Sequence, residues 1–500
     1  MNSNETVANR ERYILTPVCD RQAVTEVTGD FTLPDYQSEI RRILNVGYSV
    51  LPPARYVGAG SVEFNGNIEY QVLYVGADGG LYTAPLTSEY AFDIPFEGSG
   101  VELNEGITVF AHPSVQGITS RVSAPRRLSI RTRLACRARA YGKVPLEERP
   151  EGGEDPFCIQ RKSESVEMAS LGSAASEIIT LEEELPFSAD GDRVVGAEAK
   201  VFVDGVSANG GALTAQGNVM LKLLCAHENS VDTELIQRKL PFSGELEGEE
   251  REAGDTECRV TGYISDLTVH PEEDKLLCTV NLILEAQTGS NGTLTYTDDL
   301  YSTSRECRCE RAEYEIPVLL AAGNGNFTQS ERIPLAELNL PEGCTPVDCT
   351  GYAEFDGVEA QGNKCVLTGQ SRYVVIARRD GEYSAAECVL PIRYEVDCEP
   401  AEKMTSDSAA NVVSCRVRCE GEQLLLDSEI GVASMLLASR KIYPVQGAEF
   451  GENISHPKGD MVICYPQSGE SNWSVAKRYR VAPSAIDGNV QQDPYVLIRE

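Results

Sequence analysis

The stretch GNIEYQVLY, which runs from Gly66 to Tyr74, recurs twice further along the chain in altered form. The second copy is GNVMLKLLC from Gly217, and the third is GQSRYVVIA from Gly369. In each copy a glycine leads a run of apolar residues, and a polar turn separates this run from a second one. Two such runs joined by a short turn predict a β-hairpin. The sequence therefore predicts three copies of one β-rich unit.

The likeness continues on both sides of each hairpin. Its second strand ends on a proline and an apolar residue: Pro95–Phe96, Pro241–Phe242 and Pro391–Ile392. Upstream strands are expected from Asn45, Ala197 and Asp348, and long alternating strands downstream from Arg126, Asp274 and Glu422. Alternation of apolar and polar residues is typical of half-buried strands. ECRVTGYI from Glu257 also resembles SCRVRCEG from Ser414.

We place the three repeats at 1–150, 151–310 and 311–447, and a separate module at 460–500. The stretches EERPEGGEDP after Leu146 and GNGNF after Ala322 are expected to be joints because they are polar and rich in Gly or Pro. The predicted fold is mainly β, with tandem antiparallel β-sandwich or open-barrel repeats and a small C-terminal α+β module. One helix is expected in the repeats, over Pro34–Leu44, because Ile40, Ile43 and Leu44 fall at helical spacing after a possible N-cap at Asp35.

Charge and hydropathy exclude several classes of partner. The 500 residues include 44 basic and 77 acidic side chains, a net charge of −33. Phosphate recognition needs clustered Lys and Arg, so this balance argues against nucleic acids and against adsorption to an anionic membrane. No apolar run is long enough for a membrane span, and the N-terminus lacks the apolar region of a signal peptide. We therefore expect a cytosolic protein, and its negative charge favours solubility or a basic protein partner.

No motif for catalysis, a cofactor or a metal stands out. The four histidines have no zinc-binding spacing, and His112 and His456, each before a proline, are expected in exposed loops. No phosphate-binding loop or GxSxG nucleophile elbow occurs. The sixteen cysteines include no CxxC pair, so we expect reduced thiols packed as small apolar side chains. Oxidative cross-linking within an assembled layer is the alternative. The sequence predicts a protein that is not an enzyme and has no bound cofactor or metal.

A basic stripe crosses the first repeat. Five arginines alternate with apolar residues along one predicted strand: Arg127, Arg131, Arg133, Arg137 and Arg139. Alternation puts all five on one face. One interpretation is pairing with acidic residues of a neighbouring strand. The other is a docking stripe for an acidic neighbour, including another copy of this chain.

The module at 460–500 contains Trp473, the only tryptophan in the chain. NWSVAKRY from Asn472 predicts a helix, PSAIDGN from Pro483 opens a second short helix, and YVLIRE from Tyr495 predicts a closing strand. The formal charges of residues 461–500 cancel, unlike those of the repeats. We expect Trp473 to be the core anchor of a compact unit.

This module resembles the LysM family. The resemblance rests on these residues: Gly469, Trp473, Val475, Ala476, Tyr479, Val481, Ile486 and Asn489. It implies a partner-binding surface, for which we select Gly469, Glu470, Ser471, Asn472, Trp473, Lys477, Arg478, Arg480, Ile486 and Asn489.

The repeats are similar to the SPOCS domain of endospore-forming bacteria, through LPDYQSEIRRIL and the Gly66 hairpin. Together with the LysM-like tail, the chain resembles SipL-type spore coat morphogenetic proteins. The resemblance implies a non-enzymatic adaptor in the mother-cell cytosol at the forespore surface, where its tail binds a coat-basement ATPase or other spore coat proteins. The alternative is a peptidoglycan-binding LysM protein of the cell or spore envelope, and a weaker one is an enzyme targeted by LysM.

Overall fold

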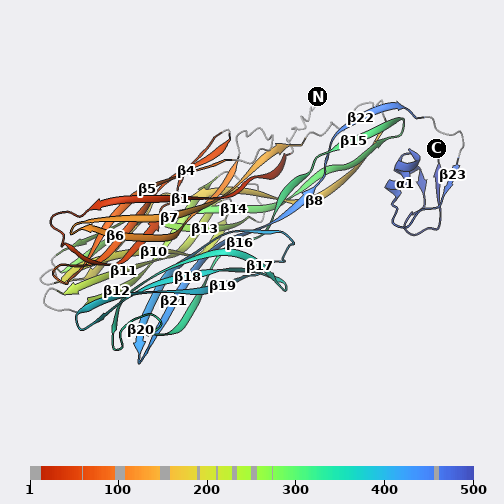
Figure 1. Cartoon of the computed structure of the whole chain (residues 1–500). Helices are drawn as coiled ribbons and strands as arrows, with labels where there is room; N and C mark the ends of the chain where they lie inside the picture. Colours follow the sequence, from red (N-terminus) through yellow and green to blue (C-terminus); the bar gives the residue numbers. More distant parts are fainter. Residues whose placement is uncertain are drawn as a thin grey trace.

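The computed structural model describes residues 13–58, 60–95, 107–146, 158–187, 192–209, 212–227, 233–248, 256–272, 274–454 and 461–499. Strands make up 80% of the structure and helices 3%, so the prediction of a mainly β protein is confirmed. The strands form three packed units and a projecting ribbon, and a small α+β module lies beyond the end of this ribbon (Figure 1).

The first unit, repeat 1, is a sandwich of two antiparallel sheets. Its strands are β1 (Tyr13–Thr32), β2 (Ile40–Val50), β3 (Ala54–Val57), β4 (Ser61–Gly76), β5 (Leu81–Pro95), β6 (Thr108–Ala124) and β7 (Arg127–Pro145). One sheet has the order β1-β7-β6, and in the other β4 pairs with β2, β3 and β5. Both sheets contribute to one core, with Phe64 and Tyr74 from β4 and Leu134 from β7. This core forms because alternate residues of each strand point to the same side.

Repeats 2 and 3 have the same two layers. The strands of repeat 2 are β8 (Ile159–Ala175), β9 (Ile179–Pro186), β10 (Asp192–Asn209), β11 (Ala212–His227), β12 (Thr233–Gly248), β13 (Glu257–Pro271) and β14 (Lys275–Ser302). Those of repeat 3 are β16 (Tyr314–Pro334), β17 (Thr345–Gln361), β18 (Lys364–Arg379), β19 (Glu382–Val396), β20 (Met404–Glu420) and β21 (Gln423–Ile442). In repeat 2, β10-β11-β12 faces β9, β14 and β13, and a short pairing of β12 with β8 joins both layers into one seven-stranded sheet. In repeat 3, β17-β18-β19 faces β16-β21-β20.

The three predicted hairpins are confirmed as β4–β5, β11–β12 and β18–β19. A side chain cannot replace the leading glycine in two of them. A Cβ at Gly217 would lie 2.1 Å from the carbonyl oxygen of Phe202, and one at Gly369 would lie 2.0 Å from that of Glu354. The neighbouring strand therefore approaches too closely for any other residue.

The expectation that each second strand ends at its Pro–apolar pair is wrong in the second and third copies, where β12 continues to Gly248 and β19 to Val396, whereas β5 does end at Pro95. The register of the pairs also differs between the copies. Gly217 lies opposite Phe242 and Gly369 opposite Ile392, as the sequence alignment requires. Gly66, however, lies opposite Tyr90 rather than Phe96. Strand register is set by cross-strand pairing and by the turn, so a similar dipeptide several residues away does not mark the same position.

The helix predicted over Pro34–Leu44 does not form. A turn covers 35–37, and β2 begins at Ile40. The ladder between β2 and β4 shifts register between Ile40 and Arg42 and again between Ile43 and Asn45. Each bulge moves the side-chain alternation by one residue, so apolar residues at helical spacing can face the core from a strand.

The two expected joints have different outcomes. GNGNF lies inside β16, where Gly323 is opposite Ser434 and Gly325 is opposite Val432 of β21. It is therefore part of the repeat 3 sandwich and not a linker. EERPEGGEDP lies outside the described residues.

The three sandwiches share apolar cores where they meet. One shared core joins the hairpin layers and includes Leu73 of repeat 1, Leu224 of repeat 2 and Ile376 of repeat 3. A second joins the opposite layers through Phe110, Met435 and neighbouring side chains. Burial of apolar surface between the repeats favours one packed body rather than three independent domains joined by linkers.

A ribbon projects from this body and leads to the C-terminal module (Figure 1). The second half of β14 pairs with β8 as far as Ser302 opposite Ile159. Next to it, β15 (Arg305–Arg311) pairs with β22 (Val445–Asn453). The module comprises β23 (Met461–Cys464), α1 (Asn472–Tyr479), a 3₁₀ turn (Pro483–Ala485), β24 (Ile486–Asp487) and β25 (Val496–Arg499).

Candidate functional site

The helix predicted at NWSVAKRY is confirmed as α1, and its ends have local causes. The Ser471 hydroxyl accepts a hydrogen bond from the Ser474 amide, and the Ser474 hydroxyl accepts one from the Ser471 amide. This reciprocal pair satisfies amides that the first helical turn leaves free. Arg480 ends the helix in the left-handed conformation, with φ of 59°. The closing strand β25 forms where it was predicted, whereas the second helix is reduced to the 3₁₀ turn Pro483–Ala485, which the strand β24 (Ile486–Asp487) follows directly.

The module has its own small core, and one residue of repeat 2 completes it. Val475 and Ala476 of α1 pack with Val496 and Ile498 of β25. Tyr301, near the end of β14, joins the same cluster and is fully buried. The module is therefore seated on the tip of the ribbon through an aromatic side chain from another part of the chain.

Trp473 lies at this contact between the module and the tip of the ribbon, which we call the seat. Its ring meets that of Tyr301 edge-on, with the ring centroids 4.9 Å apart. Its indole Nε1 donates to Oδ2 of Asp299 at 2.9 Å, and the Tyr301 hydroxyl donates to the Val481 carbonyl oxygen at 2.6 Å. Trp473 thus packs both on its own module and on repeat 2. The sequence indicated the first contact and gave no sign of the second.

Asp299 is the polar centre of the contact. Lys477 Nζ lies 2.6 Å from its Oδ1, and Arg311 Nη2 lies 3.2 Å from the same oxygen. Burial opposes ionisation, but the hydrogen bonds from Lys477 and Trp473 hold the pKa of Asp299 below its ordinary value. An ionised carboxylate therefore connects α1, β14 and β15.

The seat divides the ten selected partner-binding residues into groups. Trp473 and Lys477 contact repeat 2, and Ile486 is buried in the module core. Ser471 caps α1. The others remain at least partly accessible: Gly469, Glu470, Asn472, Arg478, Arg480 and Asn489. Among these, Arg478 Nη1 pairs with Glu470 Oε1 at 2.6 Å. Part of the predicted contact surface is therefore used within the chain.

The module also has an exposed apolar surface that the sequence analysis missed. On β23, Met461 and Ile463 are 54% and 57% exposed. Tyr465 and Tyr495 are 72% and 49% exposed, and their ring centroids lie 6.3 Å apart. We call these four residues the outer face, because Cys464 between them points into the core. The alternation in MVICY is the signal that could have revealed it.

The arginine stripe is largely paired within repeat 1. Arg131 Nε lies 3.0 Å from Glu26 Oε1, and Arg137 Nε lies 3.3 Å from Asp20 Oδ1 on β1. Arg139 is buried, and its Nη1 donates to the Ser406 carbonyl oxygen of repeat 3. Arg127 and Arg133 are exposed at the same strand face. Arg139 Nε also lies 3.3 Å from Asp20 Oδ2, so cross-strand pairing explains three of the arginines, and Arg139 in addition binds another repeat of the same chain.

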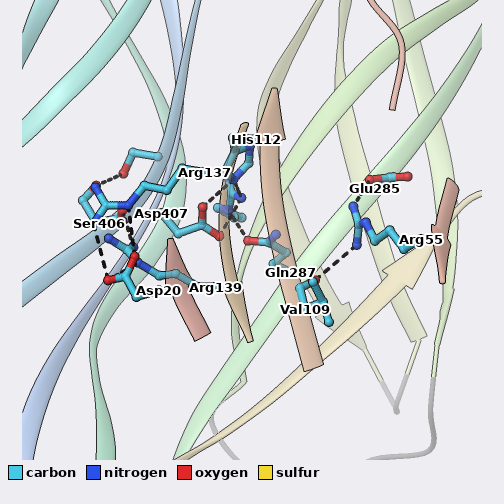
Figure 2. A network of polar contacts seen from close by, with 12 residues as sticks. Asp20, Arg55, Val109, His112, Arg137, Arg139, Glu285, Gln287, Ser406 and Asp407 are labelled. Carbon is cyan, nitrogen blue, oxygen red and sulfur yellow. Dashed lines mark hydrogen bonds and ion pairs between the residues drawn. The ribbon is translucent and has the colours of Figure 1, made fainter. Parts of the chain in front are cut away.

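A buried polar network links the three repeats (Figure 2). Arg259 of β13 is 2% exposed, and its Nη2 lies 3.0 Å from Asp407 Oδ2 of β20. Its Nε donates to Gln287 at 2.6 Å, and His112 of β6 contacts both Arg259 and Asp407. The strands β6, β13 and β20 each contain one register shift. Phe110, Arg259 and Asp407 lie the same number of residues before the shift in their own strand, so they occupy corresponding positions in the three repeats.

Two expectations from the sequence are corrected by this network. His112 lies on β6 and not in an exposed loop, and burial together with Arg259 lowers its pKa, although Asp407 opposes this. The likeness of ECRV to SCRV suggests Arg416 as the counterpart of Arg259, whereas the strand register assigns Asp407. His456 lies outside the described residues.

A cavity of about 780 Å³ lies between the repeats, and ion pairs line part of its wall. Lys222 Nζ lies 2.8 Å from Glu198 Oε2 and 2.9 Å from Asp348 Oδ1. Burial lowers the pKa of Lys222, but these carboxylates outweigh it and raise the pKa above its ordinary value. Tyr48 and Tyr352 also line this cavity, and their rings stack with centroids 4.0 Å apart. These contacts hold the repeats together.

Two further properties concern metals and membranes. Among the residues that the structure describes, no group of three or more His, Cys, Asp or Glu side chains could hold a metal ion. Within the same residues, no helix is long and apolar enough to cross a membrane. The interpretation of the C-terminal module depends on its own contacts, because no family model and no curated protein matches this chain.

Proposed function

We propose that this chain is a non-enzymatic scaffold of the spore coat. Its three repeats act as SPOCS-type domains, and its C-terminal module acts as a LysM-type adaptor. The module binds a coat morphogenetic ATPase at the forespore surface, in the mother-cell cytoplasm. The proposal comes from the sequence resemblance, and the outer face of the module supports it.

The outer face has the composition of a protein-binding surface. Met and Tyr are enriched in the centres of protein interfaces, and a cluster of exposed apolar residues often marks such a site. The face points away from the core of the module, whereas Trp473 and Lys477 are held by Asp299. A partner could therefore bind the outer face while the module stays seated.

The charge distribution supports a docking role for this part of the chain. The whole protein carries a net charge of −33, but the charges of residues 461–500 cancel. An acidic partner would be repelled by the repeats and tolerated by the module. The module would therefore oppose an acidic partner less than the repeats do.

Binding of the full-length chain to the purified coat-basement ATPase tests the proposal. Changing both Ile463 and Tyr465 to Ser removes two large exposed side chains, and we expect affinity to fall about 10- to 100-fold. Tyr56→Ser in repeat 1 is the matched control, because Tyr56 is also 60% exposed, and it should leave affinity unchanged. Equal binding by all three proteins would contradict docking through the outer face.

A parallel assay with insoluble peptidoglycan tests the envelope alternative. LysM-type sugar recognition would depend on the helix end and the late asparagine, so Asn472→Ala and Asn489→Ala should then weaken sedimentation with the glycan. Binding to peptidoglycan without binding to the ATPase would favour the envelope protein. Binding to neither would contradict both functions of the module.

A further inference from the structure

Repeat 3 contains cysteines that face one another across its two layers. Cys344 Sγ lies 3.9 Å from Cys419 Sγ, although 75 positions separate them in sequence. Behind this pair, Cys415 Sγ donates to the carbonyl oxygen of Cys349 at 2.8 Å. Cys344 immediately precedes β17, Cys349 lies near the beginning of β17, and Cys415 and Cys419 lie on β20. The two pairs therefore connect the same two segments.

These segments belong to different sheets of one sandwich. β17 pairs with β18, and β20 pairs with β21, so no backbone ladder joins β17 to β20. Side chains from both segments meet in the repeat 3 core, which includes Cys344, Cys349 and Cys415 and has Cys419 at its edge. A covalent link here would connect two layers that side-chain packing holds together.

We propose that Cys344 and Cys419 form an intramolecular disulfide when the protein meets an oxidant, and that Cys349 and Cys415 form a second one more slowly. A disulfide requires a sulfur separation of about 2.05 Å, so the first pair must close by about 2 Å. Rotation about the Cα–Cβ bonds is the side-chain movement that would bring the two sulfur atoms together. The link lies within one chain, unlike cross-linking between molecules of an assembled layer.

A low-molecular-weight disulfide such as oxidised glutathione is a sufficient oxidant. The Cys419 thiolate attacks one of its sulfurs and releases one glutathione thiolate. The Cys344 thiolate then attacks Cys419 in the mixed disulfide and releases the second. The two protons lost by the cysteines go to the two glutathione thiolates, and two electrons pass from the protein to the oxidant.

Burial sets the order of reaction. Cys419 is half-buried and can be reached by solvent, whereas Cys344, Cys349 and Cys415 are 4%, 2% and 7% exposed. Burial and the neighbouring Cys344 raise the pKa of Cys419 to about 11. Since only the thiolate reacts, the rate should rise about tenfold for each pH unit between 7 and 9.

The test uses the full-length reduced protein, oxidised glutathione and alkylation of the remaining thiols before peptide mapping. The first product should lack two of the sixteen thiols and contain a peptide joined through Cys344 and Cys419. Its melting temperature should rise by about 5–10 °C, because the bridge restricts the unfolded chain. Reduction should restore the original value.

Two variants separate this bridge from other oxidation. Cys344→Ser should abolish both the linked peptide and the rise in melting temperature. Cys388→Ser, in the same repeat, should preserve both because the pair is intact. Persistent glutathione on Cys419, disulfide-linked dimers through Cys419, or a wild-type map without the Cys344–Cys419 peptide would each overturn the proposal. These results do not depend on how the variants fold, because the wild-type map is decisive alone.

Discussion

Replacing Asp299 by Ala should loosen the C-terminal module without unfolding the repeats. The carboxylate accepts hydrogen bonds from Trp473 Nε1 at 2.9 Å and from Lys477 Nζ at 2.6 Å, and Arg311 lies 3.2 Å away. Alanine removes all of these contacts at once. It also leaves the partly buried indole N–H of Trp473 without its acceptor, which adds to the loss.

The magnitude follows from the exposure of each partner. A hydrogen bond to a charged group contributes about 1.5–3 kcal/mol. Lys477 and Arg311 are 38% and 45% exposed, so solvent screening limits each ion pair to about 0.5 kcal/mol. We expect Asp299→Ala to weaken the contact between the module and the ribbon by about 2.5–4 kcal/mol. This corresponds to about a 70- to 850-fold change in the equilibrium between seated and released forms.

The single tryptophan makes the measurement direct. Fluorescence excited at 295 nm reports only on Trp473, because the chain has no other tryptophan. We expect a red-shifted emission maximum, stronger quenching by acrylamide and a lower urea midpoint for the fluorescence change. Far-UV circular dichroism, which reports mainly on the repeats, should be unchanged.

Asp298→Ala is the matched control. Asp298 is the neighbouring residue, but its carboxylate pairs with Lys162 on β8 and not with the module. The fluorescence and the urea midpoint of the Asp298→Ala protein should match those of the wild type. If Asp299→Ala behaves like this control, Asp299 does not hold the module, and the reasoning from these contacts is refuted.

Three other predictions concern the seat and the junction of the repeats. In the same fluorescence assay, Tyr301→Phe should weaken the binding of the module to the ribbon by about 1 kcal/mol, and Tyr301→Ala by about 3–5 kcal/mol. The difference arises because only alanine also removes the ring. Equal effects would contradict a packing role for Tyr301. Asp407→Asn should reduce the free energy of unfolding by about 3–5 kcal/mol, since Arg259 would stay buried without its counter-ion, and calorimetry would test this. Burial opposes ionisation of Glu198, but Lys200 and Lys222 lower its pKa to about 2. Its stabilising effect should therefore be complete above about pH 4.5 and lost as the pH falls towards 2, and Glu198→Gln should flatten this acid limb of the melting temperature.

Local patterns in the sequence were sufficient for the elements that depend on neighbouring residues. The hairpins at Gly66, Gly217 and Gly369 follow from alternation and turn residues. Helix α1 follows from Ser471 and the apolar spacing behind it, since both its cap and its buried side are local. The mainly β fold was predictable for the same reason.

Where the local signals conflicted with pairing, the tertiary structure decided. Ile40, Ile43 and Leu44 have apolar spacing that suits a helix, but two bulges allow these residues to lie in β2. GNGNF resembles a linker, yet pairing with β21 places it inside a sandwich. In both cases hydrogen bonds to a distant strand outweighed a short-range preference.

The sequence by itself determined the β repeats, the acidic charge and the compact module around Trp473. Only the tertiary structure decided that Asp299 and Tyr301 hold that module, that Arg259 meets His112 and Asp407, and that Cys344 faces Cys419. The hydrogen bonds and sulfur contact that join these segments link residues from 75 positions apart, for Cys344 and Cys419, to 180 positions apart, for Tyr301 and Val481. No periodic pattern links such positions, because their proximity depends on how whole sheets pack.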